Sequence, residues 1–266
     1  TVYYFLRDFF PAFLVQYKRE TFGKTLEQLS SETDDVFTQF KKEKPLEINQ
    51  EQPAVVIHDL TSYMKDIKDV PEALAYLESR GCVYDEERFG QWFYGYQNLQ
   101  IGEKVYAITN TVVIPLYYCG IMYGFYSRCI DRKAFYTYMP ISNNGYKVWN
   151  WFNVDFKKPV YIFEGIFDAI ASGLENSIAV LGAKLPDERF KDLANPVLVL
   201  DNDVTGLKNS LNYAKKGYSV YIQPDIYIEK DMNELMLNNK DLDVSEMIKS
   251  NIFSSIAAEI RIKAKL

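Results

Sequence analysis

The sequence predicts an α/β protein in which a mostly parallel sheet, flanked by helices, follows an α+β segment. After Lys158, short apolar runs typical of buried strands alternate with stretches that have helical spacing. This alternation is the pattern of a parallel sheet with helices on its faces. Before Lys158, a helical stretch is followed by two long β-rich runs, which together indicate an α+β arrangement.

The composition is that of a folded chain. Its 266 residues are 48% hydrophobic and 15% aromatic, which is enough for a packed core. No apolar run of about 18 residues lacks a polar or charged interruption, and we therefore expect a soluble protein without a membrane partner. Three scattered cysteines suit a reducing compartment, and with a single histidine they cannot complete a zinc site of the paired-cysteine kind.

The net charge of −6 and the isoelectric point near 5.1 argue against a protein that coats nucleic acid non-specifically. Such binding depends on many contacts from Lys and Arg to phosphate. A local basic region remains between residues 105 and 150, with a net charge of +3. Its single acid is Asp131, and its basic residues are Arg128, Arg132, Lys133 and Lys147.

The first half of the chain is expected to divide near residue 45. Residues 1–45 are interpreted as a helical segment or linker, because Phe22, Leu26 and Leu29 have helical spacing and the charged residues 41–45 resemble a loop. Residues 46–157 are interpreted as an α+β subdomain. Its expected elements are a strand at 55–57, a helix at 71–81 that has Pro at its start and Gly at its end, and a hairpin of the runs 106–118 and 121–130.

The second half alternates more regularly, and residues 158–240 are expected to form one domain. In the stretch 205–216, Leu207, Leu211 and Ala214 lie on one face of a helix. The expected strands are 160–163, 178–181, 197–200 and 219–222, and the expected helices are 166–174, 186–193 and 205–216. The residues from 232 onward are expected to be helical, with 241–266 as a C-terminal helical segment.

Two of the expected strands run directly into acidic residues. Glu164 follows strand 160–163, and Asp201 and Asp203 follow strand 197–200. If these strands are neighbours, the carboxylates converge at the carboxyl edge of the sheet, where ligands gather, and their mutual repulsion requires a cation. Hard cations such as Mg²⁺ take oxygen ligands and leave positions open for phosphate oxygens. The pattern predicts a divalent-metal site suited to phosphoryl or nucleotidyl transfer.

Two further acids are candidates for the same edge. Asp168 lies at the start of the following helix, where the helix dipole favours a carboxylate, although a capping role explains this position almost as well. Asp231 follows strand 219–222 after a loop. Taken alone, Glu-Gly after a strand is usually a turn, and Asp-x-Asp before a helix is often a cap. Their joint occurrence after two buried strands favours a functional site.

The acidic residues belong to a longer pattern. The segments Glu164-Gly165-Ile166-Phe167-Asp168-Ala169-Ile170-Ala171 and Asp201-Asn202-Asp203 resemble the TOPRIM signature of bacterial-type primases, topoisomerases and related nucleases. The form EGxxDxxA is similar to that of DnaG-type DNA primases. Three more parts resemble primase segments in the same order: a helix that ends in YLxxRG (73–81), a strand pair (113–116 with 124–128) and a segment with a further acid (230–235).

The resemblance implies a TOPRIM fold and the activity of a DNA primase, a nucleotidyltransferase that copies a single-stranded DNA template into short RNA primers. The ligands it implies for Mg²⁺ or Mn²⁺ are Glu164, Asp201, Asp203 and Asp231, with Asp168 as a supporting catalytic residue. The residues it implies for a template and nucleotide groove are Arg128, Lys133 and Lys147. A solvated basic hairpin explains this basic region equally well.

The implied partners are single-stranded DNA, ribonucleoside triphosphates and a replicative helicase, in the cytoplasm of a bacterial or phage-infected cell. The sequence also departs from the family. Asn233 stands where the family has a second acid, which leaves the number of metals open. Asn202 replaces a glycine, a change that we attribute to the ability of Asn to adopt unusual backbone conformations. Residues 1–45 are expected to be what remains of the connection to a missing zinc-binding domain.

Several other functions remain open. Another TOPRIM enzyme is one, although a topoisomerase needs a nucleophilic tyrosine on a separate domain, and an ATPase-coupled nuclease needs a GxxxxGK[ST] loop that the sequence lacks. A haloacid-dehalogenase-like phosphatase fits residues 197–205, but only 63 residues follow Asp203 and Glu164 would be idle. A non-catalytic replisome-binding module with a vestigial metal site is the last alternative.

Overall fold

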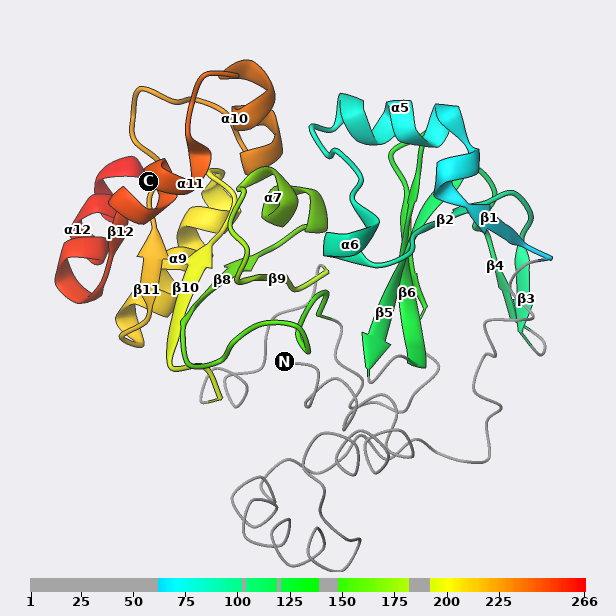
Figure 1. The fold of residues 1–266 in the computed structure, drawn as a ribbon. Helices are drawn as coiled ribbons and strands as arrows, with labels where there is room; N and C mark the ends of the chain where they lie inside the picture. Colours follow the sequence, from blue (N-terminus) through cyan, green and yellow to red (C-terminus); the bar gives the residue numbers. More distant parts are fainter. Residues whose placement is uncertain (1–61, 102–103, 119–120, 139–147, 182–191) are drawn as a thin grey trace, which may run out of the picture.

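The computed structural model describes residues 62–101, 104–118, 121–138, 148–181 and 192–266 (Figure 1). Several expectations lie outside the described residues, namely the helical segment 1–45, the strand 55–57, all but the last two residues of the helix 186–193, and Lys147. Within the described part, an antiparallel sheet and a mostly parallel sheet lie side by side, with helices between and around them. None of the described helices is long and apolar enough to cross a bilayer.

The first half forms a five-stranded antiparallel sheet with the order β1-β2-β5-β6-β7. Its strands are β1 (Met64–Asp66), β2 (Phe93–Gly95), β5 (Thr111–Tyr118), β6 (Ile121–Cys129) and β7 (Phe135–Tyr138), and a separate hairpin joins β3 (Leu99–Ile101) to β4 (Lys104–Tyr106). The expected hairpin is confirmed as β5 and β6. The run expected at 106–118 is interrupted, because Asn110 has a left-handed backbone (φ 56°) in the turn before β5.

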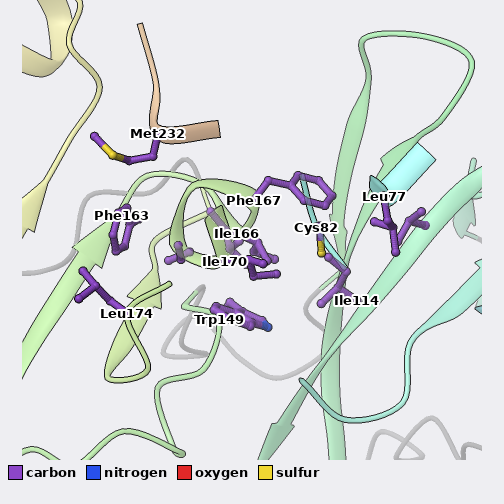
Figure 2. Close-up of a cluster of buried hydrophobic side chains, with 14 of the residues drawn as sticks. Leu77, Cys82, Ile114, Trp149, Phe163, Ile166, Phe167, Ile170, Leu174 and Met232 are labelled. Atoms are coloured by element: carbon purple, nitrogen blue, oxygen red, sulfur yellow. The ribbon is translucent and has the colours of Figure 1, made fainter. Parts of the chain in front are cut away.

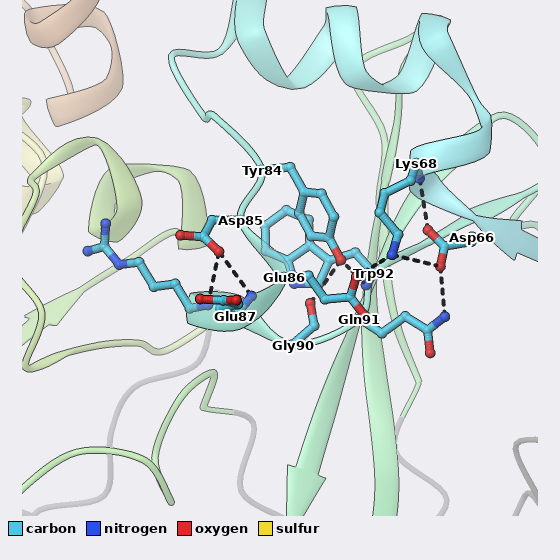
Figure 3. Close-up of polar contacts among 10 residues, drawn as sticks. Asp66, Lys68, Tyr84, Asp85, Glu86, Glu87, Gly90, Gln91 and Trp92 are labelled. Carbon is cyan, nitrogen blue, oxygen red and sulfur yellow. Dashed lines mark hydrogen bonds and ion pairs between the residues drawn. The ribbon is translucent and has the colours of Figure 1, made fainter.

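Three short helices accompany this sheet: η1 (Ile67–Asp69), α5 (Pro71–Ser79) and α6 (Glu86–Phe89). Helix α5 begins at the expected proline but ends two residues early, since Gly81 takes the left-handed conformation (φ 67°) that closes helices. Figure 3 shows how α6 is held. The Tyr84 hydroxyl donates to the Gly90 carbonyl and accepts from the Trp92 N–H, both at 3.0 Å, while the Lys68 ammonium pairs with Glu86.

The second half forms the mostly parallel sheet that the sequence predicts. Its order is β12-β11-β10-β8-β9, with β8 (Pro159–Phe163), β9 (Ser177–Ala179), β10 (Asn195–Val199), β11 (Ser219–Tyr221) and β12 (Ile252–Phe253). The first four strands are parallel, and β12 lies antiparallel on β11. The all-helical interpretation of the C-terminal part missed β12, because two residues are too few to produce a periodic pattern.

The helices of this half are α7 (Ile166–Ala171), α9 (Val204–Lys215), α10 (Met232–Asn238), α11 (Val244–Ser250) and α12 (Ser255–Lys265). They cover both faces of the sheet. Alternate residues of its strands point to opposite sides, and apolar residues on each side pack against helices. Val160 and Ile162 of β8 belong to the core cluster that includes Ala214 of α9 and Ile262 of α12. Phe163 belongs to the other cluster, which contains α7, α10 and α11.

The cluster under α7 continues into the antiparallel half, as Figure 2 shows. Phe167 of α7 meets the Tyr76 ring of α5 edge-on, with ring centroids 6.4 Å apart, and Leu77 and Ile114 belong to the same buried cluster. One core therefore spans both sheets and holds them in a fixed relation. The domain boundary expected near residue 157 stays a prediction, because this core includes residues on both sides of it.

Candidate active site

Glu164 and Asp201 leave neighbouring strands at the same edge of the parallel sheet. Strands β8 and β10 pair in parallel, with Phe163 opposite Val199, so the residues that follow both strands emerge together. Burial raises the pKa of Glu164, although a hydrogen bond from the Asp201 backbone N–H lowers this pKa in part. The Glu164 Oε1 atom is buried and has no hydrogen-bond partner in the described part of the chain.

Asp201 is the most strongly perturbed acid of this edge. Burial raises its pKa to about 7, with further contributions from the carboxylates of Asp168, Glu164 and Asp231. The carboxylates of Asp168, Glu164 and Asp231 therefore lie near enough to Asp201 to repel its negative charge. A nearby cation would stabilise the ionised form of such a carboxyl group and lower its pKa.

Asp203 has two functions at once. Its Oδ1 atom accepts hydrogen bonds from the N–H groups of Thr205 (2.9 Å) and Gly206 (2.8 Å), which caps helix α9. These bonds, with that from Gly206 contributing most, lower the pKa of Asp203. Its Oδ2 atom lies 3.2 Å from the Lys230 ammonium, which is also 3.9 Å from Asp201 Oδ2. Lys230 belongs to the segment 230–235 that resembles a primase segment, but the sequence alone indicated no role for its side chain.

Gly206 allows helix α9 to pass close to the Asp201 backbone. A Cβ atom at position 206 would lie in contact with the Asp201 carbonyl oxygen, 2.8 Å from its carbonyl carbon and 3.0 Å from its nitrogen. Any side chain there must push the acidic loop away from the helix. The signal in the sequence was the glycine three residues after Asp203.

Asp168 and Asp231 meet at the start of α10. Asp231 caps this helix through a 2.7 Å bond from the Glu234 N–H, and Asp168 accepts a 3.1 Å bond from the Asn233 N–H. Asp168 makes no cap to α7, whose N-cap is Gly165, so capping does not explain it. Burial raises the pKa of Asp168 to about 6, and Asp231 adds to the rise.

Asn202 ties the acidic loop to the segment that precedes α10. Its N–H donates to the Lys230 carbonyl at 2.7 Å, and its side-chain amide donates to the Glu229 carbonyl at 3.2 Å. The non-glycine residues with positive φ in the described part are Asn110, Asn150, Leu181 and Ser255. Asn202 is not among them, so the backbone explanation for this replacement was wrong. A glycine could not make the side-chain bond.

The donor set fits a hard divalent cation, since it consists of carboxylate oxygens and includes the orphaned Glu164 Oε1. The arrangement is not a ready coordination shell. Among the described residues, no three acids, histidines or cysteines are gathered closely enough to hold a metal ion. The Lys230 ammonium stands beside the two carboxylates of the Asp-x-Asp loop instead.

The basic candidates lie on the antiparallel sheet. Arg128, on β6 opposite Val112 and Phe135, is half-buried, and its guanidinium interacts with the hydroxyls of Tyr76 and Tyr126. Its Nε atom is buried without a hydrogen-bond partner in the described part. Lys133 is exposed in the turn between β6 and β7.

The similarity of this chain to known proteins lies in its three-dimensional structure. No family model and no curated protein sequence matches the chain. A DnaG primase catalytic domain bound to single-stranded DNA superposes with a TM-score of 0.57 at 16% identity, over 78% of this chain and 80% of the other.

Two further primase structures agree. The zinc-binding and RNA polymerase domains of the Aquifex aeolicus primase give a TM-score of 0.58 at 18% identity, over 90% of this chain and 71% of the other. The RNA polymerase domain of Mycobacterium tuberculosis DnaG gives 0.54 at 16% identity, over 73% and 80%. The expected TOPRIM α/β architecture is thus confirmed, and the chain has the fold of DnaG-type primase catalytic domains.

Proposed function

We propose that this chain is a DNA primase, which synthesises short RNA primers from ribonucleoside triphosphates on a single-stranded DNA template. The observation that carries the proposal is the meeting of Glu164, Asp168, Asp201 and Asp231 at the carboxyl edge of β8 and β10, within a primase fold. The solved neighbour that binds single-stranded DNA supports the choice of template. A replicative helicase and the cytoplasm complete the proposed setting.

Each group has a proposed task. Glu164, Asp201, Asp203 and Asp231 would hold Mg²⁺ or Mn²⁺, which when bound lowers the pKa of the attacking 3′-hydroxyl and neutralises charge on the pyrophosphate. Asp168 would help to fix the position of Asp231, because it accepts a hydrogen bond from the Asn233 N–H in the first turn of α10, the helix that Asp231 caps. Arg128, with Lys133 and Lys147, would bind phosphates of template or nucleotide. A guanidinium held by two tyrosine hydroxyls is well prepared for this task.

A second candidate is a non-catalytic module that binds replication proteins and retains a vestigial site. The absence of a three-acid metal cluster from the described residues favours it. Thermal unfolding distinguishes the two, because a ligand that binds only the native state must raise its stability. A functional site predicts a higher Tm in millimolar Mn²⁺, and a vestigial site predicts an unchanged Tm.

The direct test is primer synthesis on single-stranded DNA with ribonucleotides and Mg²⁺ or Mn²⁺. We expect Glu164→Gln and Asp201→Asn to abolish the product while circular dichroism stays native. Glu175→Gln is the matched control, since Glu175 is exposed in the turn after α7. Normal synthesis by both site variants would refute the assignment. DNA relaxation or cleavage in parallel reactions would identify a different TOPRIM enzyme.

A further inference from the structure

Lys230 occupies the cation position of the acidic edge. Its ammonium lies 3.2 Å from Asp203 Oδ2 and 3.9 Å from Asp201 Oδ2. The other oxygen of Asp203 is already engaged by the N-terminal turn of α9. The Asp203 oxygen that a metal ion would need is therefore the one that Lys230 now contacts.

The backbone of Lys230 is fixed, whereas its side chain is free to leave. Its carbonyl accepts the Asn202 N–H at 2.7 Å, and its N–H donates to Glu234 Oε2 at 3.0 Å. The side chain is 57% exposed. Four rotatable bonds and an exposed stem let the ammonium move into water without disturbing the loop, because a lysine head group is strongly hydrated.

The side chain of Asn233 is directed toward the antiparallel half rather than toward the acidic edge. Its amide donates to the Arg80 carbonyl on the other half of the molecule. Position 233 therefore adds no charge to the edge, and the Lys230 ammonium lies close to its carboxylates. That charge pattern suits a site in which an ion must compete with an internal cation.

We propose that Lys230 is a resident cation of the acidic edge, which a divalent ion displaces from Asp203 and Asp201 when it binds. The inference rests on the proposed function, since it concerns the affinity of that metal site. It accounts for acids that gather at one edge without forming a coordination shell. The ammonium stabilises the carboxylates in the absence of metal and weakens metal binding by competition.

The test is the Kd for Mn²⁺, measured by electron paramagnetic resonance of the free ion at low salt and neutral pH. Lys230→Met removes the competitor, and we expect a Kd about tenfold lower than in the wild type, a modest value because the pair is exposed to solvent. Lys230→Arg retains the charge and should bind Mn²⁺ much as the wild type does. Lys158→Met is the control for net charge, since Lys158 pairs with Asp155 next to the opposite end of β8.

The outcomes separate this inference from the proposed function. An unchanged or higher Kd in Lys230→Met, with binding lost in Asp201→Asn, would overturn the role of Lys230 and leave the metal site standing. An equal gain in Lys158→Met would show a general charge effect and would also overturn it. Absence of Mn²⁺ binding from every variant would remove both proposals. Binding by Lys230→Met alone would support the inference in its strongest form.

Discussion

The side-chain amide of Asn233 donates a hydrogen bond to the carbonyl of Arg80, 153 positions earlier in the chain. Asn233 is 1% exposed, and its backbone N–H binds Asp168 at the acidic edge. Next to this bond, the end of the Met236 side chain fills the space above Gly81. The first turn of α10 thus connects the acidic edge to the turn after α5 in the antiparallel half.

Asn233→Asp is expected to lower the free energy of unfolding by about 1–3 kcal/mol, because a carboxylate cannot donate to the buried Arg80 carbonyl and two acceptors are left facing each other. Urea denaturation measures the change. Asn212→Asp, on the exposed face of α9, is the matched control and should be close to neutral. If Asn233→Asp kept wild-type stability and bound Mn²⁺ more tightly, Asn233 would be a lost metal ligand rather than a structural contact.

Gly206→Ala is expected to destabilise the protein by about 1–3 kcal/mol, as overpacking usually does, and to weaken Mn²⁺ binding. The new Cβ would collide with the Asp201 backbone, so the loop and its carboxylate must shift. Urea denaturation and the Kd for Mn²⁺ measure the two effects. Thr205→Ala changes an exposed neighbour in the same turn and should alter neither. Wild-type values in Gly206→Ala would mean that the loop tolerates the displacement.

The strands and the acids at their ends were predictable, because both signals are local in the sequence. Buried parallel strands are apolar runs, and Glu164 and Asp201 directly follow two of them. Whether those strands pair is a long-range property, which the resemblance suggested and the β8–β10 register confirmed. The four-residue break before β5 was missed, since a single left-handed Asn110 interrupts an otherwise continuous β-rich run.

The roles of Asn202, Lys230 and Asn233 were not predictable in the same way. Each depends on a partner that lies 27 or more positions away in sequence: the Glu229 carbonyl for Asn202, Asp203 for Lys230 and the Arg80 carbonyl for Asn233. No periodicity encodes such contacts. Both asparagines stood out only as departures from a family pattern, and the structure turns these departures into hydrogen bonds that the family's glycine or acid could not make.

The buried thiols report on the packing of both halves. Burial raises the pKa of Cys82 to about 12 and also raises the pKa of Cys129. At pH 8 the Cys82 thiol is therefore protonated in the native protein, and the Cys129 thiol is less ionised than an ordinary thiol. Only a thiolate reacts with disulfide reagents. In a Cys119→Ser variant, we expect no reaction in buffer and two reactive thiols in urea. A fast-reacting thiol in buffer would mean that the turn after α5 or the end of β6 is open.

Arg128 offers a test of the nucleic-acid surface that does not depend on catalysis. Its guanidinium interacts with Tyr76 and Tyr126, and an arginine–phosphate contact adds about one unit to the slope of log K against log salt. Arg128→Ala is expected to weaken binding of single-stranded DNA for all sequences alike and to reduce this slope by about one unit, as measured by fluorescence anisotropy. Tyr76→Phe removes a hydroxyl but no charge, so affinity should fall while the slope is retained.

Arg261→Ala is the matched control for the Arg128 experiment. Arg261 lies on α12 in the parallel half, with its guanidinium 4.2 Å from the centre of the ring of Phe253 in the edge strand β12. Its removal changes net charge by the same amount but should leave both affinity and slope near the wild-type values. An equal loss in both variants would indicate a general effect of charge. A slope unchanged in Arg128→Ala would place the phosphate contacts elsewhere on the molecule, because counterion release counts the phosphates that the protein neutralises.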